Sequence, residues 1–392
     1  MKLPTRVADI EQSLVRFYTN RVDGELDLAS VLTSSPFPLE DISRAQAFNT
    51  WLTMVPELER RVALPEHGTV AELFKSISST PLGLITLART RDWFNSEHRK
   101  ALLNIRNSYF QQLKNWPDLA VTDQTFIMCD DAYSKGLPWP LYDARGTLRT
   151  DNYFETFAPK LISSVMRSDE LRGAILQADQ SSLLTTLLYE LIKNTQDHAL
   201  FTATNERIDD SVRLVLARFY DLDALDVPAP ASPDMPLEPH MAYVQALKER
   251  SVSGMRGAKD KRFCGILEFS VLDSGPGFVG RKLQREVNPQ EDIEIEYKAV
   301  LACLRAGHTT ASNPNRGLGL NDVLRALRKM NGFLRIRTNR LSGYREFKVF
   351  REQQDTDVTP VLHDWKRGYS TRASAFANVR GAAVSVLLPV EV

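Results

Sequence analysis

Apolar positions in the first third of the chain recur mainly at helical spacing. The clearest segment is 91–116, which Pro117 closes. Its apolar face consists of Trp93, Leu102, Ile105, Tyr109, Phe110 and Leu113. A strand is predicted at 124–131, and Pro138 and Pro140 then favour a loop. Residues 1–150 are therefore expected to form a mainly helical region.

From about residue 150 the pattern changes to helices followed by strands. The predicted helices are 153–167, 169–178, 181–199, 291–306 and 319–331. The predicted strands are 264–272, 333–338, 344–350 and 382–388. Prolines between 227 and 240 mark a loop that interrupts this region. Helices placed early and strands placed mostly late predict an α+β fold.

Composition and charge narrow the class of protein. The 392 residues suit two domains, or one domain with a large appendage, and 43% hydrophobic residues support a real core. Lys plus Arg and Asp plus Glu each total 49, so no global basic field indicates a nucleic acid partner. Three dispersed cysteines without CxxC spacing favour a reducing cytoplasm. We expect no membrane partner, because neither a signal peptide nor a 20-residue apolar stretch is recognisable.

The first motif with candidate chemistry is YELIKNTQDHA, residues 189–199, on the predicted helix 181–199. Glu190, Asn194 and His198 are four residues apart and therefore share one stripe of the helix. The amide oxygen of Asn194 can bind a hard cation such as Mg²⁺. The carboxylate of Glu190 can orient or deprotonate a water molecule. The alternative is an ordinary polar stripe that faces solvent.

The second motif is FSVLDSGPGF, in which a strand runs into the pattern Asp273-x-Gly275-x-Gly277. An aspartate at a strand end can accept a hydrogen bond from an exocyclic amine, and glycines let a flat ring approach the backbone. A simple Asp-Gly turn would have the same sequence.

The third motif is NRGLGLNDVLRAL, in which glycines open a helix. Free N–H groups at a helix start suit phosphate, so Gly317 and Gly319 are candidate phosphate contacts. Arg316 adds a cation beside them. A Gly-x-Gly before a helix is a weak signal when it stands alone, and the order of the three motifs carries more weight.

In this order the segments resemble the GHKL ATPase superfamily of gyrase-type topoisomerases, heat-shock chaperones, histidine kinases and mismatch-repair ATPases. ELIKN with DHA resembles the N box, DSGPG the first glycine box, RGLGL the second, and GAAVSVLLP (381–389) the closing strand. RGLGL followed by NGFLRIRT is most similar to the histidine-kinase branch. The resemblance implies a two-layer sandwich of the Bergerat type at 151–392, with insertions near 200–262 and 340–380. Residues 1–150 would be a partner or dimer module.

The resemblance also implies roles for single residues. Asn194 would bind Mg²⁺, and Glu190 would activate water. Asp273 would read the adenine amino group, and Ser385 would share a bridging water with it. Four glycines would lie at the ring and the phosphates: Gly275, Gly277, Gly317 and Gly319. Arg316 would lie beside the phosphates. Residues 279–316 would form the ATP lid.

The motifs indicate the ligand, ATP, more strongly than the reaction that follows its binding. We expect an Mg²⁺-dependent ATPase whose nucleotide state switches conformation and the binding of a protein partner or a second copy. A histidine-kinase-like phosphotransferase is an alternative, but only His98 lies on a convincing upstream helix, without the usual His-Glu-Leu-Arg-x-Pro context. A third is a non-hydrolysing nucleotide sensor in a multi-protein system, including defence systems. Segment 363–372 contains the basic residues Lys366, Arg367 and Arg372. We expect them either to contact a partner or a phosphate, or to belong to a solvated loop.

Overall fold

A computed structural model describes most of the chain. The described residues are 3–19, 24–27, 34–55, 61–63, 69, 72, 76, 79–89, 96–115, 122–133, 135–209, 211–229, 236–253, 263–305, 319–347 and 360–391. Within them, no helix is long and apolar enough to cross a membrane.

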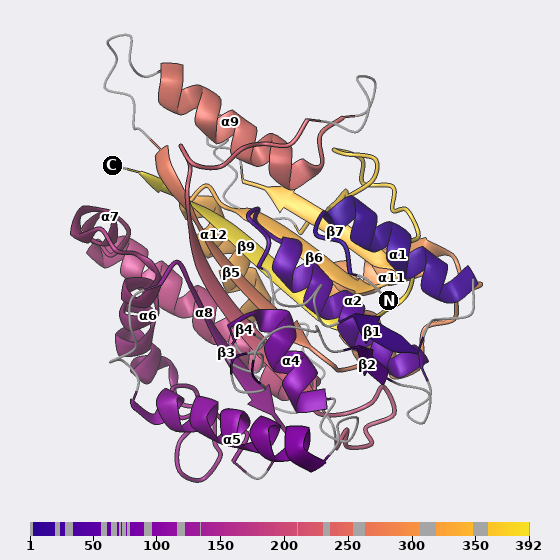
Figure 1. The fold of residues 1–392 in the computed structure, drawn as a ribbon. Helices are drawn as coiled ribbons and strands as arrows, with labels where there is room; N and C mark the ends of the chain where they lie inside the picture. Colours follow the sequence, from indigo (N-terminus) through magenta and orange to yellow (C-terminus); the bar gives the residue numbers. More distant parts are fainter. Residues whose placement is uncertain are drawn as a thin grey trace.

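A seven-stranded sheet in which every neighbouring pair is antiparallel runs through the molecule (Figure 1). In spatial order its strands are β3 (Gln124–Asp130), β4 (Val212–Asp221), β5 (Phe263–Asp273), β9 (Val379–Glu391), β6 (Phe333–Asn339), β7 (Leu341–Glu346) and β8 (His363–Asp364). A separate parallel pair joins β1 (Glu25–Asp27) to β2 (Arg61–Ala63). The α+β expectation is confirmed at this level.

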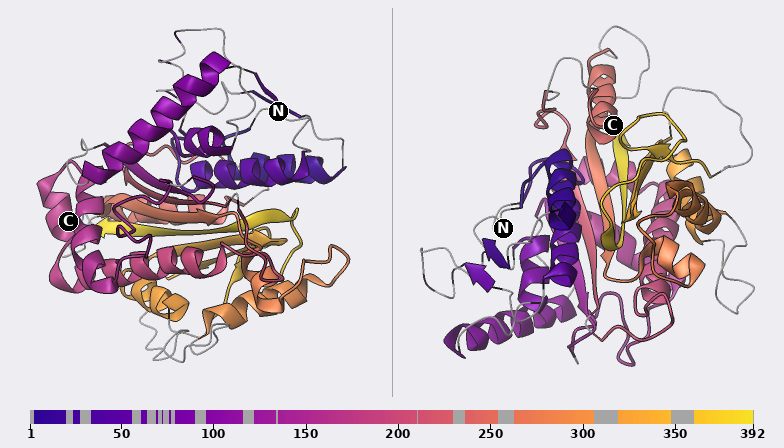
Figure 2. Two further views of the ribbon diagram at one scale, coloured as in Figure 1. Left: turned by 90° about the horizontal axis from the view of Figure 1, so that it is seen from below. Right: turned by 90° about the vertical axis from the view of Figure 1, so that its right-hand side faces the viewer.

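One face of the sheet is covered by helices from the later part of the chain (Figure 2). These are α6 (Asp151–Val165), α8 (Ala178–His198), α10 (Gly277–Leu283), α11 (Ile293–Leu304) and α12 (Gly319–Lys329). The helix α8 packs against α6, α12 and β5. The short α7 (Asp169–Ile175) connects α6 to α8. The centre of this layer is therefore the apolar helix that carries the first motif.

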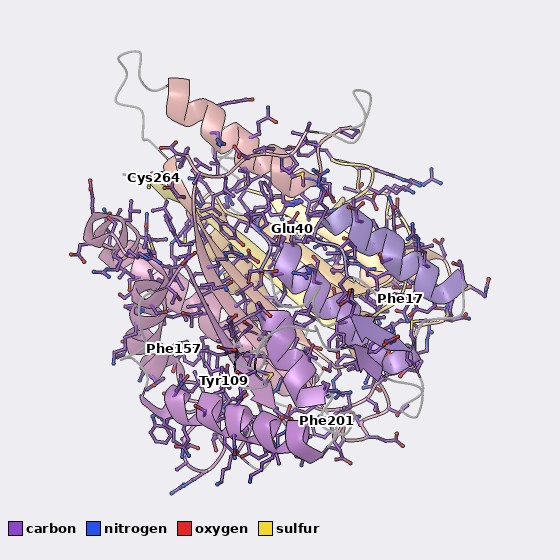
Figure 3. The ribbon with its side chains drawn as sticks, in the orientation of Figure 1. Phe17, Glu40, Tyr109, Phe157, Phe201 and Cys264 are labelled. Carbon is purple, nitrogen blue, oxygen red and sulfur yellow. The ribbon has the colours of Figure 1, made fainter. Side chains whose placement is uncertain are left out.

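The opposite face is covered by the N-terminal layer, which we define as α1 (Val7–Thr19), α2 (Glu40–Met54) and α4 (Pro81–Arg89) (Figure 2). The helix α9 (Pro239–Ser253) packs on the same face, near Glu40 at the start of α2 (Figure 3). The helix α5 (Ser96–Gln112) continues into a 3-10 turn at Leu113–Asn115. The C-terminal part therefore has helices on both faces of its sheet.

The first 150 residues and the rest of the chain share one core. Strand β3 pairs along its whole length with β4. One apolar cluster contains Ile10 and Trp51 from the N-terminal layer together with Leu184 of α8 and Val386 of β9. A boundary at residue 150 therefore does not separate two cores.

Most predicted elements after residue 90 are present with small shifts at their ends. Several elements that the periodicity does not predict are also present, among them α2, β4 and α9. Strand β4 lies within 200–262, the segment expected to be an insertion, yet it is hydrogen-bonded between β3 and β5. This segment therefore supplies an inner strand of the sheet as well as a loop.

Candidate functional site

The polar stripe of α8 is half-buried and does not face open solvent. Glu190, Asn194 and His198 all have intermediate exposure. The amide nitrogen of Asn194 donates to the carbonyl oxygen of Glu190 at 2.7 Å. Among the described residues, none donates to the amide oxygen of Asn194. This oxygen therefore remains an acceptor for a ligand or a cation.

The Glu190 carboxylate lies in a partly desolvated, acidic environment. Burial raises its pKa above the ordinary value, and the neighbouring Lys193 ammonium, 3.8 Å away, lowers it. Asp322, in the first turn of α12, adds a smaller upward effect. A carboxylate whose pKa is moved toward neutrality can take a proton from water more readily.

The start of α12 lies directly on Glu190. A Cβ atom at Gly319 would overlap the carboxylate of Glu190, so only glycine fits here without a shift. The helix N-terminus carries a partial positive charge, which favours anions beside it. Arg316 and Gly317, the other two residues predicted at this turn, lie outside the described residues.

Asp273 ends strand β5 with a buried side chain. Its Oδ1 accepts hydrogen bonds from the backbone N–H of Gly275 at 2.8 Å and of Ala382 at 3.3 Å. No described residue donates to its Oδ2. Burial raises the pKa of this carboxyl to about 6, against the opposing effect of the two hydrogen bonds. At neutral pH it is therefore mainly an anion with one oxygen available as an acceptor.

The two glycines after Asp273 are required by contacts within the protein. A Cβ at Gly275 would come within 2.8 Å of the Cα of Ala199, directly after α8. Gly277 has a positive φ of 74°, and its Cβ would lie 2.5 Å from the side chains of Thr338 and Asn339. Close packing within the protein already explains why both residues are glycines. Their expected role beside a flat ring stays a prediction.

The turn after Asp273 is held by the end of β6. Thr338 Oγ1 accepts from the N–H of Phe278 at 3.0 Å. Asn339 donates to the carbonyl oxygen of Pro276 at 3.0 Å and accepts from the N–H of Val279 at 3.3 Å. The sequence gives no sign of this role of Thr338 and Asn339, which depends on β6 lying beside the turn.

Ser385 is not brought together with Asp273. It lies opposite Ser270 in the β5–β9 register, and the two hydroxyl oxygens are hydrogen-bonded at 2.7 Å. Ser270 also donates to Glu268, whose carboxylate accepts from the N–H of Leu39 in the N-terminal region. Because side chains alternate along a strand, Ser385 faces the N-terminal layer. The residue of β9 that contacts Asp273 is Ala382, through its backbone.

Two further residues at the site were not singled out from the sequence. Gly381 has a φ of 75°, and a Cβ there would overlap the carbonyl oxygen of Asp273. Arg213 of β4 lies opposite Asp273 in register and forms an ion pair with Asp131 at 2.7 Å. Its guanidinium also donates to Gln196 of α8 at 2.6 Å. The glycine that opens GAAVSVLLP was a usable signal, whereas Arg213 had none.

The remaining candidate residues either lie away from this cluster or have side chains outside the described residues. The backbone N–H groups of Lys366 and Arg367 donate to Asp364, which holds the basic segment as a turn beside β7. The side chain of His98 lies outside the described residues. Among the described residues, no group of three or more His, Cys, Asp or Glu side chains could hold a metal ion.

Comparisons with known proteins identify no relative of this chain. No protein-family model, no curated protein and no solved structure matches the chain. The candidate site is therefore defined by its own contacts: the second half of α8, the turn after β5 and the start of α12.

Proposed function

We propose that the protein binds ATP together with Mg²⁺ in a site of the GHKL type, within a Bergerat-like fold. The observation that supports this most is that two motifs distant in sequence pack on the polar half of α8. Gly275 lies against Ala199 at one end, and Gly319 lies against Glu190. About 12 Å of helix axis separates Glu190 from His198. An elongated ligand could thus contact both glycine motifs.

Adenine would bind at the Asp273 end. The Oδ2 atom of Asp273 accepts no hydrogen bond from any described residue, while Oδ1 is fixed by Gly275 and Ala382. A fixed carboxylate with one available oxygen is suited to accept a hydrogen bond from an exocyclic amine. This chemistry favours adenine over a base that carries a carbonyl oxygen at the same position.

Magnesium would bind at Asn194, and the phosphates would lie near the start of α12. Mg²⁺ usually takes only one or two protein oxygens and completes its shell with water and phosphate. The available amide oxygen of Asn194 fits such a site, and a cage of several acidic side chains is not needed. When bound, the ion would neutralise phosphate charge.

Glu190 would act as the general base for hydrolysis. Its carboxylate would take a proton from a water molecule whose oxygen forms a bond to the γ-phosphorus. The bond between that phosphorus and the β–γ bridging oxygen breaks, and ADP and inorganic phosphate leave. Burial already raises the pKa of Glu190, which suits this role near neutral pH. The nucleotide state would then control the binding of a protein partner or a second copy.

The test combines binding and turnover on the full-length protein. Titration calorimetry with Mg²⁺ is run with ATP and with inosine triphosphate, which has no 6-amino group, and phosphate release is measured in parallel. We expect ATP to bind more tightly, and Glu190→Gln to retain binding without turnover. Absence of ATP binding to the wild type would reject the proposal. Binding without phosphate release would favour a nucleotide sensor, and a γ-phosphate label that His98→Gln removes would favour a phosphotransferase.

A further inference from the structure

The N-terminal layer contacts the candidate adenine site from behind. Ser274, which directly follows Asp273, is buried, and its Oγ lies 3.2 Å from Oδ1 of Asn49 on α2. The same hydroxyl donates to the carbonyl oxygen of Val212 at 2.9 Å and accepts from the N–H of Val212 at 3.2 Å. Ser274 therefore joins α2, the start of β4 and the turn that carries Asp273.

A second contact runs from the next residue of α2 to the strand beside the site. Thr50 Oγ1 accepts from the backbone N–H of Arg380 at 3.0 Å. The guanidinium of Arg380 donates through Nε to the carbonyl oxygen of Ser274 at 2.8 Å. Arg380 is followed by Gly381 and Ala382, which touch Asp273. Two successive residues of α2 thus reach both chain segments that hold the carboxylate.

The side chain of Asn49 is poorly suited to a purely structural role. It is buried, and among the described residues its Nδ2 has no hydrogen-bond partner. An unpaired buried donor lowers stability by about 1–3 kcal/mol, so an apolar residue of similar size would pack at least as well. The contact between its amide group and the Ser274 hydroxyl, 3.2 Å apart, is the one polar interaction with a described residue that asparagine adds here.

We propose that Asn49 and Ser274 are positioning residues that couple the N-terminal layer to the Asp273 carboxylate. This inference rests on the proposed function, because it assigns the layer a regulatory role at that ATP site. A displacement of α2 moves Ser274, and with it the N–H of Gly275 that fixes Asp273 Oδ1. Coupling is reciprocal, so bound ATP also holds α2 in place. A partner that binds the exposed side of α1, which packs on α2, would thereby change the affinity for adenine.

The experiment compares Asn49→Leu, Asn49→Ala, Ser274→Ala and the double variant Asn49→Ala/Ser274→Ala with the wild type. The leucine variant guards against a folding defect, because it leaves no cavity. Ser43→Ala is the matched control. Ser43 is a buried serine of α2 whose hydroxyl forms hydrogen bonds with Leu39 and Arg335 and, among the described residues, none with the candidate site. Affinities for ATP and inosine triphosphate and amide hydrogen exchange of peptides spanning 40–54 and 273–282 are measured.

The coupling predicts a specific pattern. Each single variant weakens ATP binding about tenfold, leaves inosine triphosphate binding unchanged and speeds exchange in 273–282 without nucleotide. The double variant is no weaker than a single one, because both remove the same contact. In the wild type, ATP slows exchange in 40–54. Ser43→Ala changes neither the ATP preference nor exchange in 273–282.

The outcomes separate this inference from the proposed function. If the wild type binds no ATP but the variants still speed exchange in 273–282, the proposed function fails and the mechanical link to the Asp273 turn stands. If ATP binds and the Asn49 and Ser274 variants match Ser43→Ala in both measurements, the coupling is overturned and ATP binding stands. Equal losses for ATP and inosine triphosphate would also overturn it, because they indicate a general structural defect.

Discussion

Gly319 lies in contact with Glu190, the two residues coming from the start of α12 and the middle of α8. The contact is so close that a Cβ at 319 would overlap the Glu190 carboxylate. It joins two motifs that are 129 positions apart in the numbering of the chain (319 minus 190). The positive end of the α12 dipole thereby lies beside the proposed catalytic base and the proposed phosphate position.

Substitution Gly319→Ala tests this contact. The added methyl group displaces the Glu190 carboxylate, so we expect phosphate release to fall at least about tenfold, since small misplacements of a catalytic group are costly. The matched control is Gly173→Ala in α7, where a Cβ meets no atom within 4 Å. The control should leave turnover unchanged and raise stability by up to about 1 kcal/mol. Equal turnover in the two variants would contradict the role of the contact.

Substitution Glu190→Gln tests the proposed base. Glutamine has nearly the same shape but cannot take a proton from water, so we expect phosphate release to fall about 100-fold or more. The ATP dissociation constant should change little, as measured by calorimetry. A variant that keeps wild-type turnover would exclude Glu190 as the base.

Substitution Asp273→Asn separates binding from folding. Asparagine keeps an oxygen for the N–H groups of Gly275 and Ala382 but removes the buried charge and offers an amide nitrogen at the other position. We expect ATP binding to be lost while the protein without nucleotide unfolds at the same or a higher temperature. Loss of folding would instead indicate that the charge itself is structural.

The pH dependence of the same residue has a defined sign. The folded pKa of Asp273 is about 6, above its ordinary value of 3.8, so the folded state holds the proton more tightly. Its contribution to stability therefore becomes less favourable by roughly 3 kcal/mol as pH rises from about 4 to about 6. ATP affinity should change in the opposite sense and weaken below pH 6, where the acceptor is protonated. In denaturant titrations Asp273→Asn should remove this dependence of stability on pH, and the pH dependence of ATP affinity is measured on the wild type by calorimetry.

His240, in the first turn of α9, predicts acid sensitivity on the other face of the sheet. It is fully buried, stacks on Trp365 and has no hydrogen-bond partner at either ring nitrogen among the described residues. Burial, and then the nearby Arg335 guanidinium, lower its pKa well below 6.5. Since the unfolded chain protonates near 6.5, stability should fall as pH drops below that value, by up to about 2 kcal/mol at pH 5. Urea unfolding of His240→Phe should show a smaller fall.

A matched glycine pair tests the strand beside Asp273. Gly381 and Gly368 have similar positive φ values, 75° and 68°, but only a Cβ at 381 would overlap a neighbour, the carbonyl oxygen of Asp273. Gly368→Ala should cost about 1–2 kcal/mol for its backbone conformation. Gly381→Ala should cost clearly more and also weaken ATP binding. Equal losses in thermal unfolding would show that the overlap is relieved at no cost.

Two of the elements that the periodicity did not predict, α2 and β4, share a physical cause. In α2, nearly every residue is buried, and polar residues such as Gln46 and Asn49 bond the sheet and the site instead of solvent. In β4, the buried Arg213 and the half-buried Arg218 form ion pairs with aspartates from other segments. Such charges interrupt an apolar pattern, and their burial is possible only once the distant partner is in place.

The sequence alone determined the local elements that carry the chemistry. The apolar face of α8, the strand that ends at Asp273 and the glycine start of α12 are encoded in neighbouring residues, because helical and strand periods are local. The tertiary structure alone decided which of these groups meet. It brought Gly319 to Glu190, turned Ser385 toward the N-terminal layer and placed Asn49 behind Ser274. Strand register and helix packing depend on contacts between distant segments, and no local pattern specifies them.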